Sequence, residues 1–121
     1  MEIPKDVPAT VRPIVEAAIE TVEAIAPKAT RVPYRMARPR SSSMMWKLVR
    51  YEVDGENVVG IGTFSRHSTM FFYRGRELDE EGKVLQGTGK DSRFLTLRTS
   101  ADASSAQAKR LVRKAFQLAG R

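Results

Sequence analysis

Two strand-like segments separated by only two residues constrain the fold of this chain more than any other feature. Residues 44–53 and 57–65 have the composition of β-strands, and Asp54-Gly55 lies between them. Asp and Gly both tolerate a positive φ, which the tight turns of two-residue β-hairpins require. The sequence therefore predicts two adjacent antiparallel strands in the middle of the chain.

An unbroken register through this hairpin predicts which side chains share each face of the sheet. One face carries Met45, Val49, Tyr51, Val53, Val58, Gly60, Gly62 and Phe64. Because Gly60 and Gly62 have no side chains, we expect a helix to approach the sheet closely there. The other face carries Trp46, Leu48, Val59 and Ile61, which is more apolar than a solvated face usually is. We expect the second helix, a partner subunit in a homodimer, or a ligand to cover it.

Two further strands follow in the sequence. Residues 69–74 predict a third strand with aromatic side chains at Phe71, Phe72 and Tyr73, and residues 93–98 predict a fourth. A long polar turn, 75–90, connects them. The irregular, basic segment 28–43 contains a candidate short strand at 32–36, and its three consecutive serines, 41–43, predict a mobile loop.

Helices are predicted at both ends of the chain. Residues 8–26 place apolar side chains at helical spacing, with Thr10 as the N-cap, Pro13 in the first turn and Pro27 after the end. Residues 103–119 do the same, with Asp102 or Ser100 as the cap and Gly120 after the last turn. The two apolar stripes are Val11, Ile14, Val15, Ala18, Val22 and Ile25, and Ala108, Leu111, Val112, Ala115 and Ala119.

This order of elements predicts an α+β fold. An antiparallel sheet of four to five strands would be flanked by an N-terminal and a C-terminal helix. A chain of 121 residues fits one domain, 1–121, which can bury a core without crosslinks. The absence of cysteine excludes disulfides, thiolate zinc sites and thiol catalysis, and it agrees with a reducing compartment.

Charge and hydropathy bear on location and partners. The first residues contain no apolar segment of the signal-peptide type, and no apolar run reaches the roughly 18 residues of a membrane span. We therefore expect a cytoplasmic protein without membrane contact. Lys and Arg total 21 against 14 Asp and Glu, a formal net charge of +7. A basic surface favours acidic proteins, small anions or nucleic acid as partners.

The glycine-rich turn before the fourth strand is the candidate binding site. Gly87-Thr88-Gly89-Lys90 resembles part of a P-loop, but Val84 and Asp91 occupy positions that need Gly and Ser or Thr. A backbone nest whose N–H groups converge on an anion remains compatible with the two glycines. The same glycines also permit a plain tight turn into the strand. The predicted ligand-binding residues are Arg74, Arg76, Gly87, Thr88, Gly89, Lys90 and Arg93.

No catalytic, metal or cofactor arrangement is recognisable in the sequence. His67 is the single histidine, and a metal site or a Ser-His-Asp triad needs partners that the sequence does not place beside it. Trp46 and the aromatic residues 71–73 could stack on bases, although strand aromatics are more often core. We therefore expect a non-enzymatic protein without a cofactor.

Residues 58–97 resemble the YdhG-like domain superfamily, a family catalogued as a domain of unknown function. The resemblance rests on Gly60-Ile61-Gly62-Thr63-Phe64, on Arg74-Gly75-Arg76-Glu77-Leu78 and on Leu85-Gln86-Gly87-Thr88-Gly89-Lys90 with Arg93. Both terminal helices are similar as well. The resemblance implies the α+β fold and, through some relatives described as frataxin-like iron chaperones, an iron-delivery role.

Three functions are carried forward. The first is a binding module for a small anionic ligand or an acidic partner at the glycine-rich turn. The second is nucleic-acid binding through the basic surface. The third is the iron role that the resemblance implies, which a chain of net charge +7 fits poorly. Its two acidic groups are Glu16, Glu20 and Glu23, and Glu77, Asp79, Glu80 and Glu81.

Overall fold

The computed structural model describes residues 2–121, and it contains one five-stranded antiparallel sheet. The strands pair in sequence order, so the sheet is a simple meander. They are β1 (Thr30–Pro33), β2 (Trp46–Val53), β3 (Glu56–Thr63), β4 (Ser68–Phe72) and β5 (Arg93–Leu97). The predicted α+β class and antiparallel sheet are confirmed, and the first strand begins two residues before the predicted 32–36.

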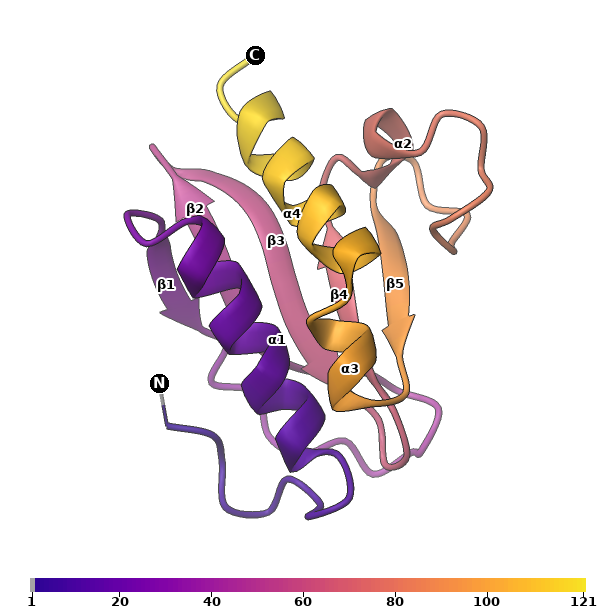
Figure 1. Cartoon of the computed structure of the whole chain (residues 1–121). Coiled ribbons are helices and arrows are strands. Elements are labelled where there is room, and N and C mark those ends of the chain that lie inside the picture. The colour runs from indigo at the N-terminus through magenta and orange to yellow at the C-terminus, as the bar shows by residue number, and fades with distance from the viewer. Residues whose placement is uncertain (1) are drawn as a thin grey trace.

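The main helices lie together on one face of this sheet (Figure 1). They are α1 (Arg12–Ile25), α4 (Ala106–Leu118) and the short α3 (Ser100–Ala103), while the equally short α2 (Gly75–Leu78) lies near the start of β5. The core fills the space between the helices and the sheet. Its centre is formed by fully buried side chains from both layers, including Val15, Val22, Tyr51, Ile61, Met70, Phe72, Leu97 and Val112.

Helix α1 buries the predicted stripe but begins later than the predicted 8–26. Val11, not Thr10, is the N-cap, and no side chain caps this end. Pro8 instead accepts backbone hydrogen bonds from Val11 and Arg12, which makes residues 8–11 a turn. Pro13 lies in the first turn, where its missing N–H has no helical partner to lose.

The central hairpin forms as predicted, but its register differs from the predicted one. Asp54 and Gly55 have φ of 49° and 80°, as a tight two-residue turn requires. Two irregularities then shift the pairing, one between Lys47 and Val49 and one between Tyr51 and Glu52. A β-bulge inserts one unpaired residue, and each such residue changes which side chains face the core.

The predicted faces are therefore confirmed only in part, because Trp46, Val59 and Ile61 share a face as predicted, whereas Val49 and Tyr51 lie on that same face and not with Gly60 and Gly62. Val49 pairs with Ile61, Tyr51 with Val59 and Trp46 with Thr63, so these side chains share one face. That face carries the helices, since the Tyr51 hydroxyl donates a hydrogen bond of 2.8 Å to Glu23 on α1. Burial and the Glu23 hydrogen bond raise the pKa of Tyr51 above its ordinary value.

The role predicted for Gly60 and Gly62 was wrong for the same reason. Both lie on the face without helices, and side chains from β4 and from the residue before β2 fill the space above them. The ring of Phe71 lies over Gly60, and the thioether of Met45 lies over Gly62. The missing side chains at these glycines therefore make room for Phe71 and Met45, and not for a helix.

The closing helix predicted over 103–119 forms as α4, and the separate short α3 precedes it. Thr99 caps α3 and forms a capping box with Asp102, so the predicted caps Ser100 and Asp102 lie inside the first turn. Ser105 interrupts the helix and caps α4 by accepting from the Ala108 N–H at 3.1 Å. Gly120 follows α4 with a φ of 85°. None of the helices described has the length and apolar character needed to cross a bilayer.

Candidate functional site

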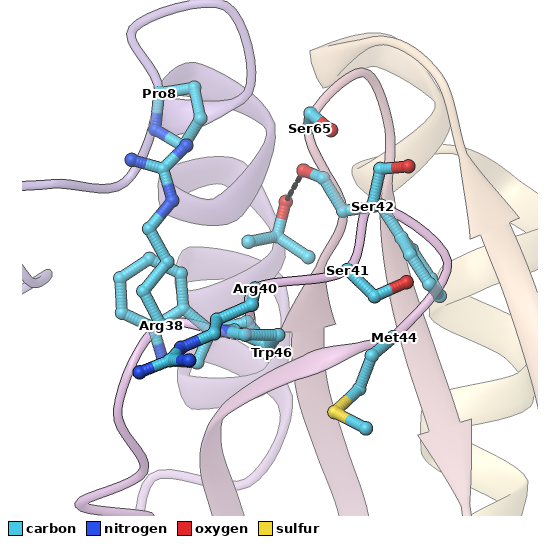
Figure 2. A pocket seen from close by; sticks show the side chains of 11 residues that line it. Pro8, Arg38, Arg40, Ser41, Ser42, Met44, Trp46 and Ser65 are labelled. Atoms are coloured by element: carbon cyan, nitrogen blue, oxygen red, sulfur yellow. Dashed lines mark hydrogen bonds between the residues drawn. The ribbon is translucent and has the colours of Figure 1, made fainter.

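A pocket of about 340 Å³ lies between the segment before α1, the loop before β2 and the end of β3. Figure 2 shows Pro8 and Arg38 on one side of it and Ser42 and Ser65 on the other. Its lining consists of Pro8, Arg38, Pro39, Arg40, Ser41, Ser42, Met44, Trp46, Thr63, Phe64 and Ser65. Among the described residues, this lining includes two arginines and no carboxylate.

Trp46 gives the pocket a fixed aromatic wall. It is the first residue of β2, only 5% of its surface is exposed, and its indole N–H donates to the Met36 carbonyl oxygen at 3.0 Å. This hydrogen bond also ties the segment after β1 to the start of β2. The wall therefore needs no rearrangement before a ligand contacts it.

The end of β3 supplies a second fixed wall. The Thr63 hydroxyl is buried and donates to the Phe64 carbonyl oxygen at 2.9 Å, as the dashed line in Figure 2 shows. The Phe64 ring stacks on His67, with ring centres 4.6 Å apart. Burial and the nearby Arg98 lower the pKa of His67, so we expect a neutral imidazole at pH 7.

The mouth of the pocket is polar and cationic. Arg38 donates to the Asp6 carbonyl oxygen at 3.1 Å, which leaves most of its guanidinium donors available. Arg40 is exposed, and the Ser41 and Ser43 hydroxyls are 2.7 Å apart. Met44 is 56% exposed, an unusually high value for a large apolar side chain in this chain. Such a mouth suits a ligand with both an anionic and an apolar part.

The structure brings only part of the predicted glycine-turn site together. The N-terminus of α2 contacts the turn, since the Arg76 N–H donates to the Asp91 carbonyl oxygen at 2.9 Å and Gly75 lies against Arg93. Gly87, with a φ of 121°, lies against the Phe94 ring. Thr88, Gly89 and Lys90 are exposed in the same turn.

Two of the cations predicted for that site, Arg93 and Arg76, are bound to other groups of the protein. Arg93 donates to the carbonyl oxygens of Gly89 and Ser92 at 2.5 and 2.7 Å, and Arg76 forms an ion pair of 3.2 Å with Asp91. The turn therefore directs carbonyl oxygens toward its own arginine. A nest for an anion instead needs converging N–H groups.

Arg74 lies apart from the glycine turn. Its guanidinium contacts Glu77 at 2.6 Å, Glu56 at 3.5 Å and the Leu118 carbonyl oxygen at the end of α4 at 2.6 Å. The Glu77 hydrogen bond is the main cause of the raised pKa of Arg74. This residue joins β3, α2 and α4, which is a structural role.

The acidic residues of the described chain form no site of the iron-binding kind. Within residues 2–121, no group of three or more His, Asp or Glu side chains is placed to hold a metal ion. In the 77–81 cluster, Asp79 accepts backbone N–H groups from Leu85, Val84 and Lys83. These hydrogen bonds lower the pKa of Asp79, and both of its carboxylate oxygens accept hydrogen bonds from the loop.

Comparison with known proteins adds no relative. The chain matches no family model, no curated protein and no solved structure. The YdhG-like assignment therefore stays a resemblance carried by the motifs of residues 58–97.

Sequence reasoning missed the pocket beside Trp46. Its residues come from three segments, and no motif spacing connects Pro8, Arg40 and Ser65. The available signal was the segment 35–43, rich in arginine and serine, which ends three residues before the single tryptophan. Only the fold shows that this segment lies against the end of β3.

Proposed function

We propose that this chain is a non-enzymatic binding module whose ligand is a small anion with an apolar part, held in the pocket beside Trp46. The observation that carries the proposal is the lining of that pocket. Arg38 and Arg40 lie there beside serine hydroxyls and an aromatic wall, and none of the described lining residues is Asp or Glu. Arginine suits phosphate and carboxylate groups, because its planar fork can donate two parallel hydrogen bonds.

The size of the pocket favours a small ligand. At about 340 Å³ it is near the lower end of the range for ligand sites, which runs from roughly 300 to 1,000 Å³. Trp46 and Phe64 would contact the apolar part, while the arginines and Ser42 or Ser65 would meet the anionic group. A phosphate or carboxylate on a single ring has this combination of properties.

The glycine-rich turn is the second candidate position for an anion. Its exposed cation is Lys90, and Arg93 would have to give up its hydrogen bonds to Gly89 and Ser92 before it could bind a ligand. We therefore favour the Trp46 pocket. For the iron-delivery role implied by the YdhG-like resemblance, no group of three or more His, Asp or Glu side chains within residues 2–121 is placed to hold a metal ion.

Thermal unfolding with a panel of ligands tests the proposal. The panel holds inorganic phosphate, phenyl phosphate and phenylacetate, with anaerobic ferrous iron as a separate arm. A ligand at about 100 times its Kd stabilises the folded state by roughly 2.7 kcal/mol, which gives a readable rise in Tm. We expect phenyl phosphate to raise the Tm more than phosphate does, because only the former contacts Trp46 and Phe64.

Charge-matched variants locate the effect. Arg38→Gln with Arg40→Gln should abolish the rise, whereas Arg110→Gln with Arg113→Gln, which removes two exposed charges from α4, should retain it. Lys90→Ala with Arg93→Ala tests the glycine turn in the same assay. Loss of the rise in this last variant alone would move the site to the turn. A rise with ferrous iron alone would favour the iron role instead.

A further inference from the structure

The face of the sheet that no helix covers carries a row of aromatic and cationic side chains. Figure 1 shows α1, α3 and α4 on one side of the sheet only. On the other side, cross-strand pairing aligns one residue from each strand. From β1 to β5 the row is Val32, Arg50, Gly60, Phe71 and Phe94.

Aromatic rings converge on Gly60, where this row lacks a side chain. The Phe71 ring lies over the glycine, and Tyr34 and Tyr73 flank it, with ring centres 6.3 and 5.8 Å from that of Phe71. The Tyr34 and Tyr73 hydroxyls form a hydrogen bond across the sheet. Tyr34, Tyr73 and Phe94 are each partly exposed to solvent.

Cations lie among these rings. The Lys47 ammonium is 5.8 Å from the Tyr34 ring centre and 5.7 Å from that of Phe71, and the Arg50 guanidinium is 5.1 Å from Tyr34. Glu52 is half-buried and pairs with Arg50 at 3.5 Å. Lys47 is exposed, which allows it to reach a phosphate while its stem stays on the rings.

The glycine-rich turn extends the same face beyond β5. Gln86 pairs with Phe94 in an isolated bridge, and its side chain accepts a hydrogen bond from Thr96 at 2.9 Å. Gly87 lies against the Phe94 ring, and Lys90 is exposed three residues later. Cations therefore accompany the aromatic row at β2 and at its β5 end.

We infer that this open face binds single-stranded nucleic acid, with bases on the exposed rings and phosphates at Lys47, Arg50 and Lys90. From Arg50 to Phe94 the row crosses three strand spacings, or about 14 Å, which is room for two or three stacked bases. Base stacking on aromatic side chains combined with a cationic track is the usual basis of sequence-tolerant single-strand binding. The net charge of +7 complements such a polyanion.

The experiment measures binding by the fluorescence anisotropy of a labelled oligothymidylate of twelve nucleotides in 50 mM salt. We expect saturable binding that weakens steeply as salt rises, because bound phosphates displace counterions. Lys47→Gln should weaken binding and reduce the salt slope by about one. Phe94→Leu should weaken binding about fivefold or more with an unchanged slope, because it removes stacking and not charge. Circular dichroism confirms that each variant is folded.

Control experiments test whether binding depends on this face of the sheet or only on the positive charge of the protein. Lys109→Gln removes the same charge from α4, on the opposite side of the sheet, and should bind like the wild type. A duplex of the same length should bind more weakly than the single strand, because paired bases cannot stack on the rings. No anisotropy change at 50 mM salt would overturn the inference, and so would equal effects of Lys47→Gln and Lys109→Gln with no effect of Phe94→Leu.

Discussion

At the scale of single residues, positions without a side chain decide how the open face is built. Gly60 and Gly62 are two residues apart on β3, and the side chains of Phe71 and Met45 lie over them. A methyl group at Gly60 would overlap the Phe71 ring, which is 6% exposed and has little freedom to move. Close packing makes such overlaps costly.

Gly60→Ala is therefore expected to destabilise the fold by about 1–3 kcal/mol, as overpacking usually does. Chemical denaturation measures the change. Gly89→Ala is the matched control, because the added methyl group would be in ordinary contact with the Ser92 carbonyl oxygen only, at 3.7 Å. The control should be neutral or slightly stabilising. Equal effects of the two substitutions would contradict the packing assigned to Phe71.

Tyr51 gives a second prediction at this scale, one that depends on pH. Its pKa is raised above the ordinary 10.0, so the folded state favours the neutral phenol. The stabilisation is complete below pH 10 and is lost as the pH rises toward the folded pKa. Tyr51→Phe should cost about 0.5–1.5 kcal/mol at pH 7, the usual value of one hydrogen bond.

Above pH 10, the prediction concerns how steeply the free energy of unfolding falls with pH in the wild type and in Tyr51→Phe. Between pH 10 and 11, the free energy of unfolding should fall more steeply for the wild type than for Tyr51→Phe, by up to about 1.4 kcal/mol per pH unit. Denaturation at several pH values measures it. Parallel curves for the two proteins would show that Tyr51 ionises equally well in the folded state.

At the scale of elements, a single carboxylate organises the loop between α2 and β5. Asp79 accepts N–H groups from Lys83, Val84 and Leu85 at 3.1, 2.8 and 2.6 Å, and Leu85 reaches the core with 7% of its surface exposed. Asp79→Asn should speed amide hydrogen exchange at Val84 and Leu85. Asp91→Asn, which changes an exposed ion pair with Arg76, should not. Unchanged exchange in Asp79→Asn would contradict this role.

The elements themselves could largely be predicted from the sequence, because local signals specify them. Asp54-Gly55 predicted the hairpin, and helical spacing predicted α1 and α4. The faces of β2 and β3 could not be predicted, because two bulges shift the register and nothing local marks them. The break at Ser105 was also missed, since its neighbours fit one continuous helix.

The candidate site was harder to predict than the elements, because it depends on contacts between distant segments. The cations at Arg74, Arg76 and Arg93 are close enough in sequence to suggest a cluster. Their partners Glu56, Asp91 and the carbonyl oxygens of Leu118, Gly89 and Ser92 become visible only in the fold. The pocket beside Trp46 needs the loop before β2 to meet the end of β3.

At the scale of the whole molecule, the sheet has two different surfaces. One is buried under helices, while the other carries partly exposed rings and cations. Trp46, Val59 and Ile61 had suggested an apolar surface for a homodimer, but they lie on the helix side or its edge. Among the described residues, Met36 and Met44 are the large apolar side chains most exposed to solvent.

A monomer of 13.5 kDa is therefore the expected state in solution. The surface area of two exposed methionines is far smaller than the roughly 1,000 Å² that a stable interface buries. Light scattering at tens of micromolar tests this expectation. A mass of twice that value would restore the homodimer predicted from the sequence and would direct attention to the open face as its interface.

The most direct test of the proposed function uses Trp46 itself. It is the single tryptophan and it lines the pocket, so its emission reports a ligand there. Titration of the wild type with phenyl phosphate, excited where only tryptophan absorbs, should give a saturable change. Arg38→Gln with Arg40→Gln should lose this change, and Arg110→Gln with Arg113→Gln should keep it. An emission that stays constant in the wild type, or that changes equally in both double variants, would contradict an anion site beside Trp46.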